Sequence, residues 1–320
     1  MGLSLADLHA VIARYGPIVQ FHPDERYLPC SVEWFLERAL LCSPSGKVQA
    51  TPTNLPTQPP TGDEHAYWLE LKDEASRSGD LSSAVAYVHA KPADVSGQTD
   101  ITFWFFYAFN GPGALKAFPI DDRIAFDKFG EHTGDWETVT LRIDDATKTL
   151  KSVYMSQHDS GQWVTDLSQL KMCNDRPVVY ASQNGHASYP RAGPNPTHET
   201  EKPAPWPLSG DLYDIYLINA CADGGPSLDC SVNYVLVSAD FLGSEKPVEP
   251  AWLNYSYRWG PHIVYSADTL DKFVDSLPGP SLLLDILKPW IVAALPDEVR
   301  EEDGPTGPKV KSSWLGRPED

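Results

Sequence analysis

The sequence predicts a mainly β protein, an antiparallel β-sandwich decorated with helices near both ends. Short runs with strand-like composition recur through the middle of the chain, and turns rich in Pro and Gly separate them. No region alternates strands with helices as a parallel sheet requires. One run, residues 101–109, is apolar on both faces, which is typical of a central strand covered on both sides.

The N-terminal part, residues 1–42, is expected to hold two helices and the first strand of a single domain that spans residues 1–320. Ser4 is a good N-cap for a helix from about Leu5 to Tyr15, which Gly16 and the following proline end. Residues 18–22 form a short strand. Ser31 then caps the second helix.

The remaining segments are assigned in the same way. Residues 43–64 are Pro/Thr-rich without periodicity and predict a long surface loop. Residues 65–265 should form the sandwich core, and residues 266–320 the C-terminal helices and a Pro-rich tail. The expected strands are 84–89, 101–109, 138–143, 152–158, 177–182, 212–218 and 253–257, and the expected C-terminal helices are 268–275 and 282–295.

Composition limits the partners of this acidic protein. A net charge of −19 argues against binding nucleic acid or an anionic lipid surface, both of which need lysine and arginine. The most hydrophobic stretch, residues 282–295, is too short to span a bilayer, so no integral membrane segment is expected. The N-terminus does not have the pattern of a secretory signal, which favours an intracellular protein. The five cysteines predict buried thiols, although Cys221 and Cys230 could form a bridge in an oxidising compartment.

A strand in the middle of the chain places two carboxylates among hydrocarbon. With a period of two, Asp135 and Glu137 share a face with Val139, Leu141 and Ile143, whereas the other face looks polar and exposed. A buried carboxylate must be protonated, paired with a cation or bound to a metal. Without a partner, the pKa of Glu137 should therefore rise.

Three histidines lie beside this strand or at the ends of the next two strand-like segments. His132 precedes the carboxylates, and His158 and His186 end the two segments that follow. Strands that are consecutive in sequence are usually neighbours in a sheet, so these groups are expected to converge in one cluster. The alternative is a purely structural network in which carboxylates hold the imidazole rings and tie loops together.

Four segments of the chain form a distinctive set of motifs. They are Phe-His-Pro-Asp-Glu-Arg-Tyr-Leu-Pro at 21–29, Gly-Asp-Trp-Glu at 134–137, Asn-Gly-His-Ala-Ser-Tyr-Pro at 184–190 and Gly-Pro-Thr-Gly-Pro-Lys at 304–309. Together these segments resemble the Vps62 (vacuolar protein sorting-associated protein 62) family of fungal and plant proteins, and the resemblance runs from about residue 16 to the C-terminus. The family takes its name from a vacuolar protein sorting phenotype, so the resemblance implies a cytoplasmic or vacuole-associated protein and transfers no catalytic residue.

Two functions fit these observations. The first is an enzyme that acts on a small organic molecule by acid/base or metal-assisted chemistry, with Glu137 as general base or metal ligand, His158 and His186 as acid/base partners, and Asp135 orienting a histidine. A divalent metal ion is one option for a cofactor, with His132, Asp135, Glu137, His158 and His186 as candidate ligands for zinc, manganese or iron(II). The second is a non-catalytic module for vacuolar trafficking or for binding a sugar or lipid.

Overall fold

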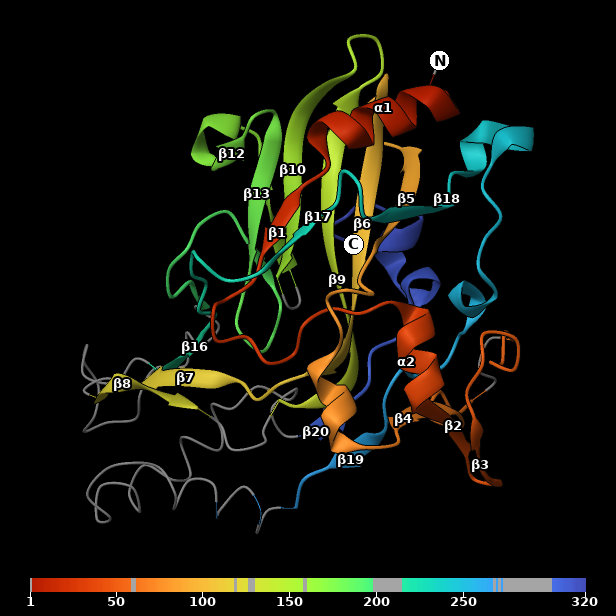
Figure 1. The fold of residues 1–320 in the computed structure, drawn as a ribbon, viewed down its shortest axis with the longest axis vertical. Helices are drawn as coiled ribbons and strands as arrows, with labels where there is room; N and C mark the ends of the chain where they lie inside the picture. The colour runs from red at the N-terminus through yellow and green to blue at the C-terminus, as the bar shows by residue number, and fades with distance from the viewer. Residues whose placement is uncertain are drawn as a thin grey trace.

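The computed structural model describes residues 2–58, 62–117, 120–125, 130–157, 160–197, 215–266, 269, 272 and 301–320. It is mainly β, and two α-helices lie near the N-terminus (Figure 1), while the described residues Thr269 and Lys272 are also helical. The helix predicted from Leu5 to Tyr15 is confirmed as α1 (Leu5–Tyr15), with the Ser4 cap and Asp7 forming a capping box. Ser31 caps α2 (Val32–Arg38), as expected.

The largest sheet has six strands and is built around two long neighbours. Strands β6 (Gln98–Asn110) and β9 (His132–Asp144) pair antiparallel from the Gln98–Asp144 pair to the Asn110–His132 pair. The order is β11-β10-β9-β6-β5-β18, in which only β18 runs parallel to its neighbour. The other four strands are β5 (Ala86–Pro92), β10 (Thr149–Gln157), β11 (Ser160–Val164) and β18 (Tyr234–Ser238).

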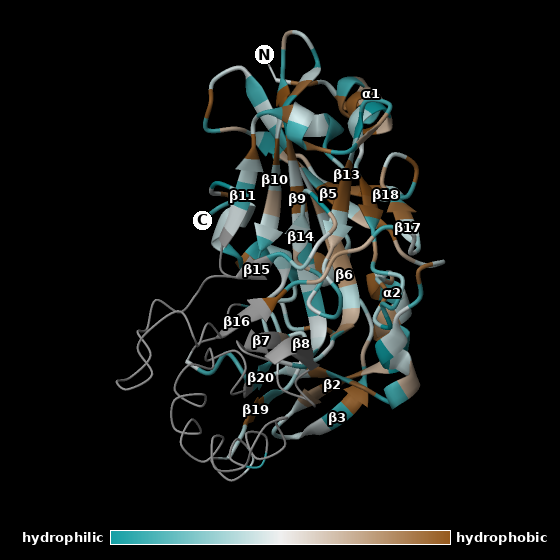
Figure 2. Ribbon diagram, turned by 90° about the vertical axis from the view of Figure 1, so that its left-hand side faces the viewer, coloured by the Kyte–Doolittle hydropathy of each residue, from teal (hydrophilic) through white to brown (hydrophobic). Residues whose placement is uncertain are grey.

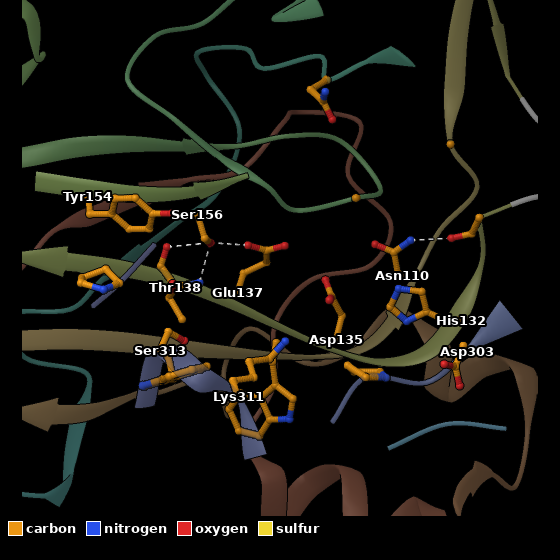
Figure 3. Close-up of a pocket in the computed structure, with 18 of the residues that line it drawn as sticks. Asn110, His132, Asp135, Glu137, Thr138, Tyr154, Ser156, Asp303, Lys311 and Ser313 are labelled. Atoms are coloured by element: carbon orange, nitrogen blue, oxygen red, sulfur yellow. Dashed lines mark hydrogen bonds between the residues drawn. The ribbon is translucent and has the colours of Figure 1, made fainter. Parts of the chain in front are cut away.

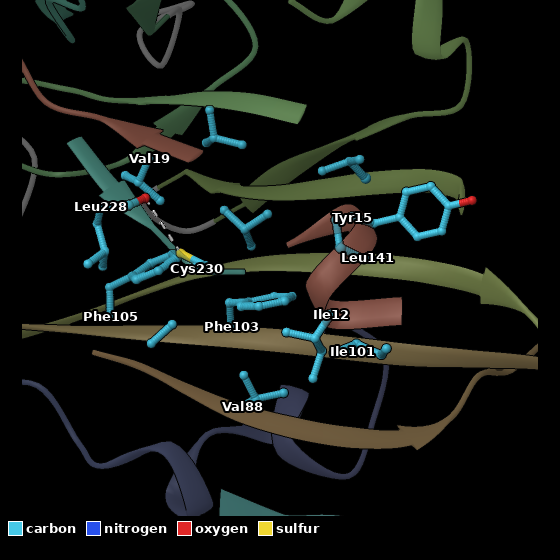
Figure 4. Packing of buried hydrophobic residues seen from close by; sticks show 14 of the residues in the cluster. Ile12, Tyr15, Val19, Val88, Ile101, Phe103, Phe105, Leu141, Leu228 and Cys230 are labelled. Atoms are coloured by element: carbon cyan, nitrogen blue, oxygen red, sulfur yellow. Dashed lines mark hydrogen bonds between the residues drawn. The ribbon is translucent and has the colours of Figure 1, made fainter. Parts of the chain in front are cut away.

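A second sheet packs over one face of the first. Its path is β12 (Met172–Cys173), β13 (Arg176–Ala181), β1 (Ile18–Gln20) and β17 (Ser227–Asp229), and β14 (Ser188–Tyr189) pairs with β13. The pairing of β1 with β13 is parallel, which the antiparallel expectation did not include. Apolar side chains of α1, β1 and β17 meet those of β6 and β9 in a first core cluster (Figure 4).

The opposite face of the large sheet is also covered, mainly by aromatic residues. A second core cluster packs Trp104, Phe106 and Trp136 against α2 and against Trp252 and Trp259. The expectation that this face of β9 is exposed is therefore wrong, since Trp136 is 4% and Thr140 is 0% exposed. Helix α1 is amphipathic and shows alternating teal and brown stretches in Figure 2, with its apolar residues turned to the first cluster.

Three smaller sheets extend the lower end of the molecule in Figure 1. The first two have the orders β3-β2-β4 and β15-β16-β7-β8, and the third pairs β19 with β20. Their strands are β2 (Ala39–Ser43), β3 (Gly46–Gln49), β4 (Trp68–Leu71), β7 (Ala114–Ala117), β8 (Ile120–Ala125), β15 (Pro196–Thr197), β16 (Ile215–Ile218), β19 (His262–Val264) and β20 (Glu301–Asp303).

Short 3-10 helices connect many of these elements, and one replaces a predicted strand. The strand expected at 253–257 is wrong, because Ala251–Asn254 form a 3-10 turn that starts at Pro250 and buries Trp252 and Leu253 in the second core cluster. The long loop expected at 43–64 contains β3. The 3-10 helices are η1 (Glu74–Ser78), η2 (Leu167–Gln169), η3 (Asp240–Glu245), η4 (Ala251–Asn254), η5 (Pro308–Val310) and η6 (Ser312–Trp314).

Several further expectations concern the termini and the cysteines. The helices predicted at 268–275 and 282–295 fall on or overlap residues outside the described part of the chain. All five cysteines are free thiols, so Cys221 and Cys230 are not bridged, and four of the five are buried while Cys173 is exposed. Within the described residues, no helix has the length and apolar character that a membrane crossing needs.

The C-terminal segment is fastened to the large sheet by a buried lysine. Lys91 on β5 is 8% exposed, and its ammonium donates to the backbone carbonyls of Ser313, Trp314 and Gly316. The indole of Trp314 stacks on His89, with ring centroids 3.9 Å apart. These contacts, with that of Trp314 on Trp104, hold residues 313–316 against β5 and β6 although they are remote in sequence.

A buried ion pair joins β6 to β9, and its loss should destabilise the fold. Arg142 donates to both carboxylate oxygens of Asp100 at 2.8 Å, and the Asp100 side chain is 2% exposed. We expect Arg142→Met to lower the free energy of unfolding by about 3–5 kcal/mol, because it leaves a buried carboxylate without its cation. Urea unfolding checks this. Arg14→Met, in the exposed pair with Asp175, is the matched control and should change stability little.

Candidate functional site

A cavity of about 510 Å³ lies beside the first half of β9. Its floor is formed by β9 and its neighbours, and the C-terminal segment forms the opposite wall. Figure 3 shows Asp135 and Glu137 projecting from the same strand, with Lys311 and Ser313 across from them and Asp303 beyond His132. Trp104 and Trp136 border the cavity, and its polar lining residues include Asn110, His132, Asp135, Glu137, Thr138, Tyr154, Ser156, Asn219, Asp303, Lys311, Ser313, Glu319 and Asp320.

Asp135 is held by a buried histidine behind the cavity. The His186 Nδ1 donates to Asp135 Oδ2 at 2.9 Å, and the His186 side chain is 0% exposed. Burial works to raise the pKa of Asp135, but the hydrogen bond and charge of His186 outweigh it and lower this pKa below its usual value. Tyr107, which faces Asp135 in the β6–β9 register, stacks on the imidazole with centroids 3.7 Å apart. Asp135 is therefore an ionised, oriented carboxylate.

A second carboxylate, Glu25, lies on the other side of the same imidazole. It accepts hydrogen bonds from the backbone N–H groups of Arg26, Tyr27 and Asn184, and its Oε1 lies 4.0 Å from His186 Nε2. His186 and Asn184 both have positive φ, 56° and 71°. Left-handed backbone at residues other than glycine costs free energy and persists where the surroundings impose it. The loop at 183–187 is thus held in a strained shape that sets the imidazole between two carboxylates.

Glu137 has a different environment although it lies only two residues away. Burial and the negative charge of Asp135 raise the pKa of Glu137 to about 8. Its Oε2 lies 2.6 Å from Ser156 Oγ, which also accepts from the Thr138 N–H and lies 3.0 Å from the Thr138 carbonyl. One hydroxyl proton cannot serve both oxygen neighbours. A protonated Glu137 that donates to Ser156, which in turn donates to Thr138, satisfies every group.

His132 lies at the start of β9, where a glycine lets two segments approach closely. Its Nδ1 is 2.7 Å from the Gly134 carbonyl, and burial lowers the pKa of the imidazole. Gly134 has φ +70°, and a Cβ there would lie 2.9 Å from the Trp259 carbonyl oxygen. A side chain at 134 would therefore push His132 away from the segment that leads into β19. His132 is thus a neutral donor or acceptor at one end of the cavity.

The structure brings together only part of the predicted site. Asp135, Glu137 and His132 line one cavity, and His186 contacts Asp135 from behind it. His158 lies outside the described residues. The candidate metal ligands around Glu137 do not bring three ligand atoms within 4.8 Å of one another among the described residues, whereas His65, His262 and Asp303 do.

Several residues of the site were missed from the sequence. Glu25 belongs to a Pro-Asp-Glu segment that also looks like an ordinary turn, so its burial had no local signal. Lys311 and Asp303 come from a charged C-terminal stretch that nothing in the sequence linked to β9. The only signal was the resemblance to the Vps62 family. One of its segments, residues 21–29, contains Glu25, and another, residues 304–309, lies between Asp303 and Lys311.

Comparison with known proteins gives a family and weaker structural similarities. A model of the family described as Vps62, vacuolar protein sorting-associated protein 62, matches residues 3–318. The curated protein of that name from Saccharomyces cerevisiae (strain ATCC 204508 / S288c) is 21% identical over 321 aligned positions, which cover 83% of this chain. The chain spans 63% of the length of that relative.

Two solved structures illustrate the similarities of fold. One, described as a toxin fold for microbial attack and plant defense, has a TM-score of 0.37 and 12% identity and covers 89% of this chain and 90% of its own. Another, described as NLPPya in complex with glucosamine, has a TM-score of 0.37 and 11% identity and covers 77% of each chain. At such TM-scores these similarities carry no information about a ligand of this chain.

The proton on Glu137 should make stability depend on pH. Its pKa rises from 4.5 to about 8 on folding, so between these values the folded state holds a proton that the unfolded chain releases. The free energy of unfolding therefore falls as pH rises through this range. Glu137→Gln removes this effect, so we expect the free energy of unfolding of the variant to rise relative to that of the wild type by up to about 1.4 kcal/mol per pH unit from pH 5 to pH 8.

Urea unfolding of both proteins at several pH values measures the difference. Glu37→Gln is the matched control, because Glu37 on α2 is exposed and lies outside the cavity lining. Its profile should run parallel to that of the wild type. Parallel profiles for Glu137→Gln as well would show that Glu137 titrates normally in the folded protein.

Proposed function

We propose that this chain, which belongs to the Vps62 family, is a ligand-binding module whose cavity beside β9 takes a small molecule that carries hydroxyl groups and a positive charge. The observation that carries the proposal is the cavity itself. Its volume of about 510 Å³ lies within the range of about 300–1,000 Å³ that is usual for small-molecule sites.

The lining favours a polar ligand that is rich in hydroxyl groups. Hydroxyl and amide side chains of Asn110, Tyr154, Ser156 and Ser313 offer both donors and acceptors around the cavity. Trp104 and Trp136 also border the cavity, although their side chains are almost fully buried in the second core cluster. A molecule with several hydroxyl groups fits this polar lining.

The charge of the lining favours a cation. Asp135, Asp303, Glu319 and Asp320 face the cavity together with Glu137, whereas Lys311 is the only lysine or arginine that lines it among the described residues. A cavity with an excess of one sign concentrates ligands of the opposite sign. A protonated amine on the ligand would lie near Asp135, whose lowered pKa keeps it ionised.

In this proposal Glu25 and His186 support the site from behind Asp135 and do not contact the ligand. His186 is fully buried, so its imidazole acts through the hydrogen bond that orients Asp135. Oriented carboxylates held by buried partners lower the cost of ordering the site when a ligand binds.

A second candidate, an acid/base enzyme, is favoured by the pKa of Glu137. A carboxyl group with a pKa of about 8 is close to the value at which a side chain transfers protons efficiently near neutral pH. Paired carboxylates whose pKa values are pushed apart are typical of acid/base sites. In that case Glu137 donates or accepts the proton and Asp135 remains charged.

We propose the cellular setting of this module from its family. A protein of this family is named for vacuolar protein sorting, so we place this module in an intracellular, cytoplasmic or vacuole-associated setting. Its partner is then a small molecule, in keeping with the net charge of −19 that disfavours nucleic acid.

Binding of a hydroxylated amine should release the proton of Glu137. We expect N-methylglucamine, which stays protonated from pH 6 to pH 8, to bind up to about tenfold more tightly per pH unit in this range, because its cation favours the ionised carboxylate. Calorimetric titration in two buffers of different ionisation enthalpy measures both the affinity and the protons released. Glu137→Gln should bind without releasing a proton and without the pH dependence.

Two comparisons sharpen this experiment. Sorbitol, the neutral polyol of the same size, should bind more weakly and with little pH dependence, and Glu37→Gln should behave like the wild type. Equal affinity for both compounds, or no binding of either, contradicts the proposal. Conversion of the bound amine, followed by NMR and lost in Glu137→Gln while binding persists, would favour the enzyme.

A further inference from the structure

Two histidines and an aspartate gather at the edge of the β19–β20 pair, away from the Asp135–His186 contact. His65 Nε2 lies 3.2 Å and His262 Nδ1 lies 3.5 Å from the same oxygen, Oδ1 of Asp303. All three ligand atoms lie within 4.8 Å of one another. From this geometry we propose that His65, His262 and Asp303 bind a divalent transition metal ion, with zinc as the ion of choice.

Two of the three separations between the ligand atoms match those of a metal site. Zinc binds imidazole nitrogen and carboxylate oxygen at about 2.0–2.2 Å with tetrahedral geometry, which places neighbouring ligand atoms about 3.3 Å apart. The separations of 3.2 and 3.5 Å lie on either side of this value. Two imidazoles with one carboxylate are also a donor set that suits zinc and its neighbours among the first-row metals.

The backbone holds the three residues in place from three segments. His262 at the start of β19 is directly paired with Asp303 at the end of β20. The segment that carries His65 is joined to this pair because Trp68, three residues further on, forms a β-bridge with Arg258. Loop closure for the site is therefore achieved by the fold before an ion arrives, which reduces the cost of binding.

Neighbouring charges complete the environment of the cluster. Arg258 binds Asp303 Oδ2 at 2.8 Å and Glu64 at 2.9 Å, so the arginine occupies the carboxylate oxygen that the histidines do not face. On the far side of the His65 ring, Nδ1 lies 3.9 Å from Asp63. This distance is too long for a hydrogen bond, so Asp63 adds only negative charge near the ring.

The exposure of the cluster allows an ion to reach it. The side chains of His65, His262 and Asp303 are 32%, 31% and 26% exposed. The two imidazole rings lie 4.4 Å apart beside the same carboxylate oxygen. This oxygen has two lone pairs and can also accept from two imidazole N–H groups, so zinc binding distinguishes a shared cation from a hydrogen-bonded network.

The proposal is independent of the ligand proposed for the cavity. Asp303 also lines the cavity, so the ion would lie at its edge, but neither histidine is part of the lining. A variant that loses zinc binding therefore need not lose binding of the cavity ligand, so substitutions can separate the two sites.

Zinc binding to the full chain tests the site. After removal of bound metal with a chelator, calorimetric titration with zinc chloride should give one site per chain. We expect His262→Gln and His65→Gln each to weaken binding by about tenfold or more, because each removes one of three protein ligands. Bound zinc should also raise the thermal unfolding temperature of the wild type in a concentration-dependent way, and of these variants less.

Matched variants decide where the ion lies. His9→Gln removes an exposed histidine of α1 and should bind zinc like the wild type, as should Glu137→Gln in the cavity. Circular dichroism confirms that each variant is folded. If His262→Gln and His65→Gln bind zinc as tightly as the wild type does, for example because the exposed Cys173 holds the ion, the proposal is overturned. Loss of binding in Glu137→Gln alone also overturns it, because the ion would then belong to the cavity carboxylates.

Discussion

The antiparallel pairing of β6 with β9 is the constraint on which the rest of the molecule depends. Because the two strands are in register over their whole length, both faces of β6 become core, and Tyr107 comes to lie opposite Asp135. Every element that covers the large sheet packs on side chains that this pairing orders. The site follows from it too, since the stacked Tyr107 and the hydrogen-bonded Asp135 hold His186 from two directions.

The two carboxylates of β9 show how neighbouring groups of one strand can be given opposite properties. Asp135 gains a buried imidazole that lowers its pKa, whereas burial and the charge of Asp135 raise the pKa of Glu137 more than its hydrogen bond with Ser156 lowers it. The strand sets only part of these environments, through the charge of Asp135 beside Glu137. The rest comes from other segments, which are the loop at 183–187 for Asp135 and β10 for Glu137.

The parts of the fold with local signals were predictable, and those that depend on distant contacts were not. Ser4 and Gly16 bound α1 because capping is decided within a few residues. The position of Asp135 and Glu137 on the same face as the core residues of β9 followed from the two-residue period of a β-strand. The burial of Trp136 on the other face could not be predicted in this way, because it depends on Trp252 and Trp259, more than 100 residues further along the chain. Likewise, nothing near Glu25, His65 or Asp303 indicates the groups that they meet.

The tie between Lys91 and the carbonyls of residues 313–316 has a consequence for the order in which the protein acquires its site during synthesis. A ribosome releases β5, β6 and β9 long before the segment that forms the far wall of the cavity. The nascent chain can pair these strands early, yet Asp135 and Glu137 stay open to water until Lys311 and Trp314 emerge. Chaperones would therefore meet a sheet whose aromatic face, including Trp104, still lacks part of its cover.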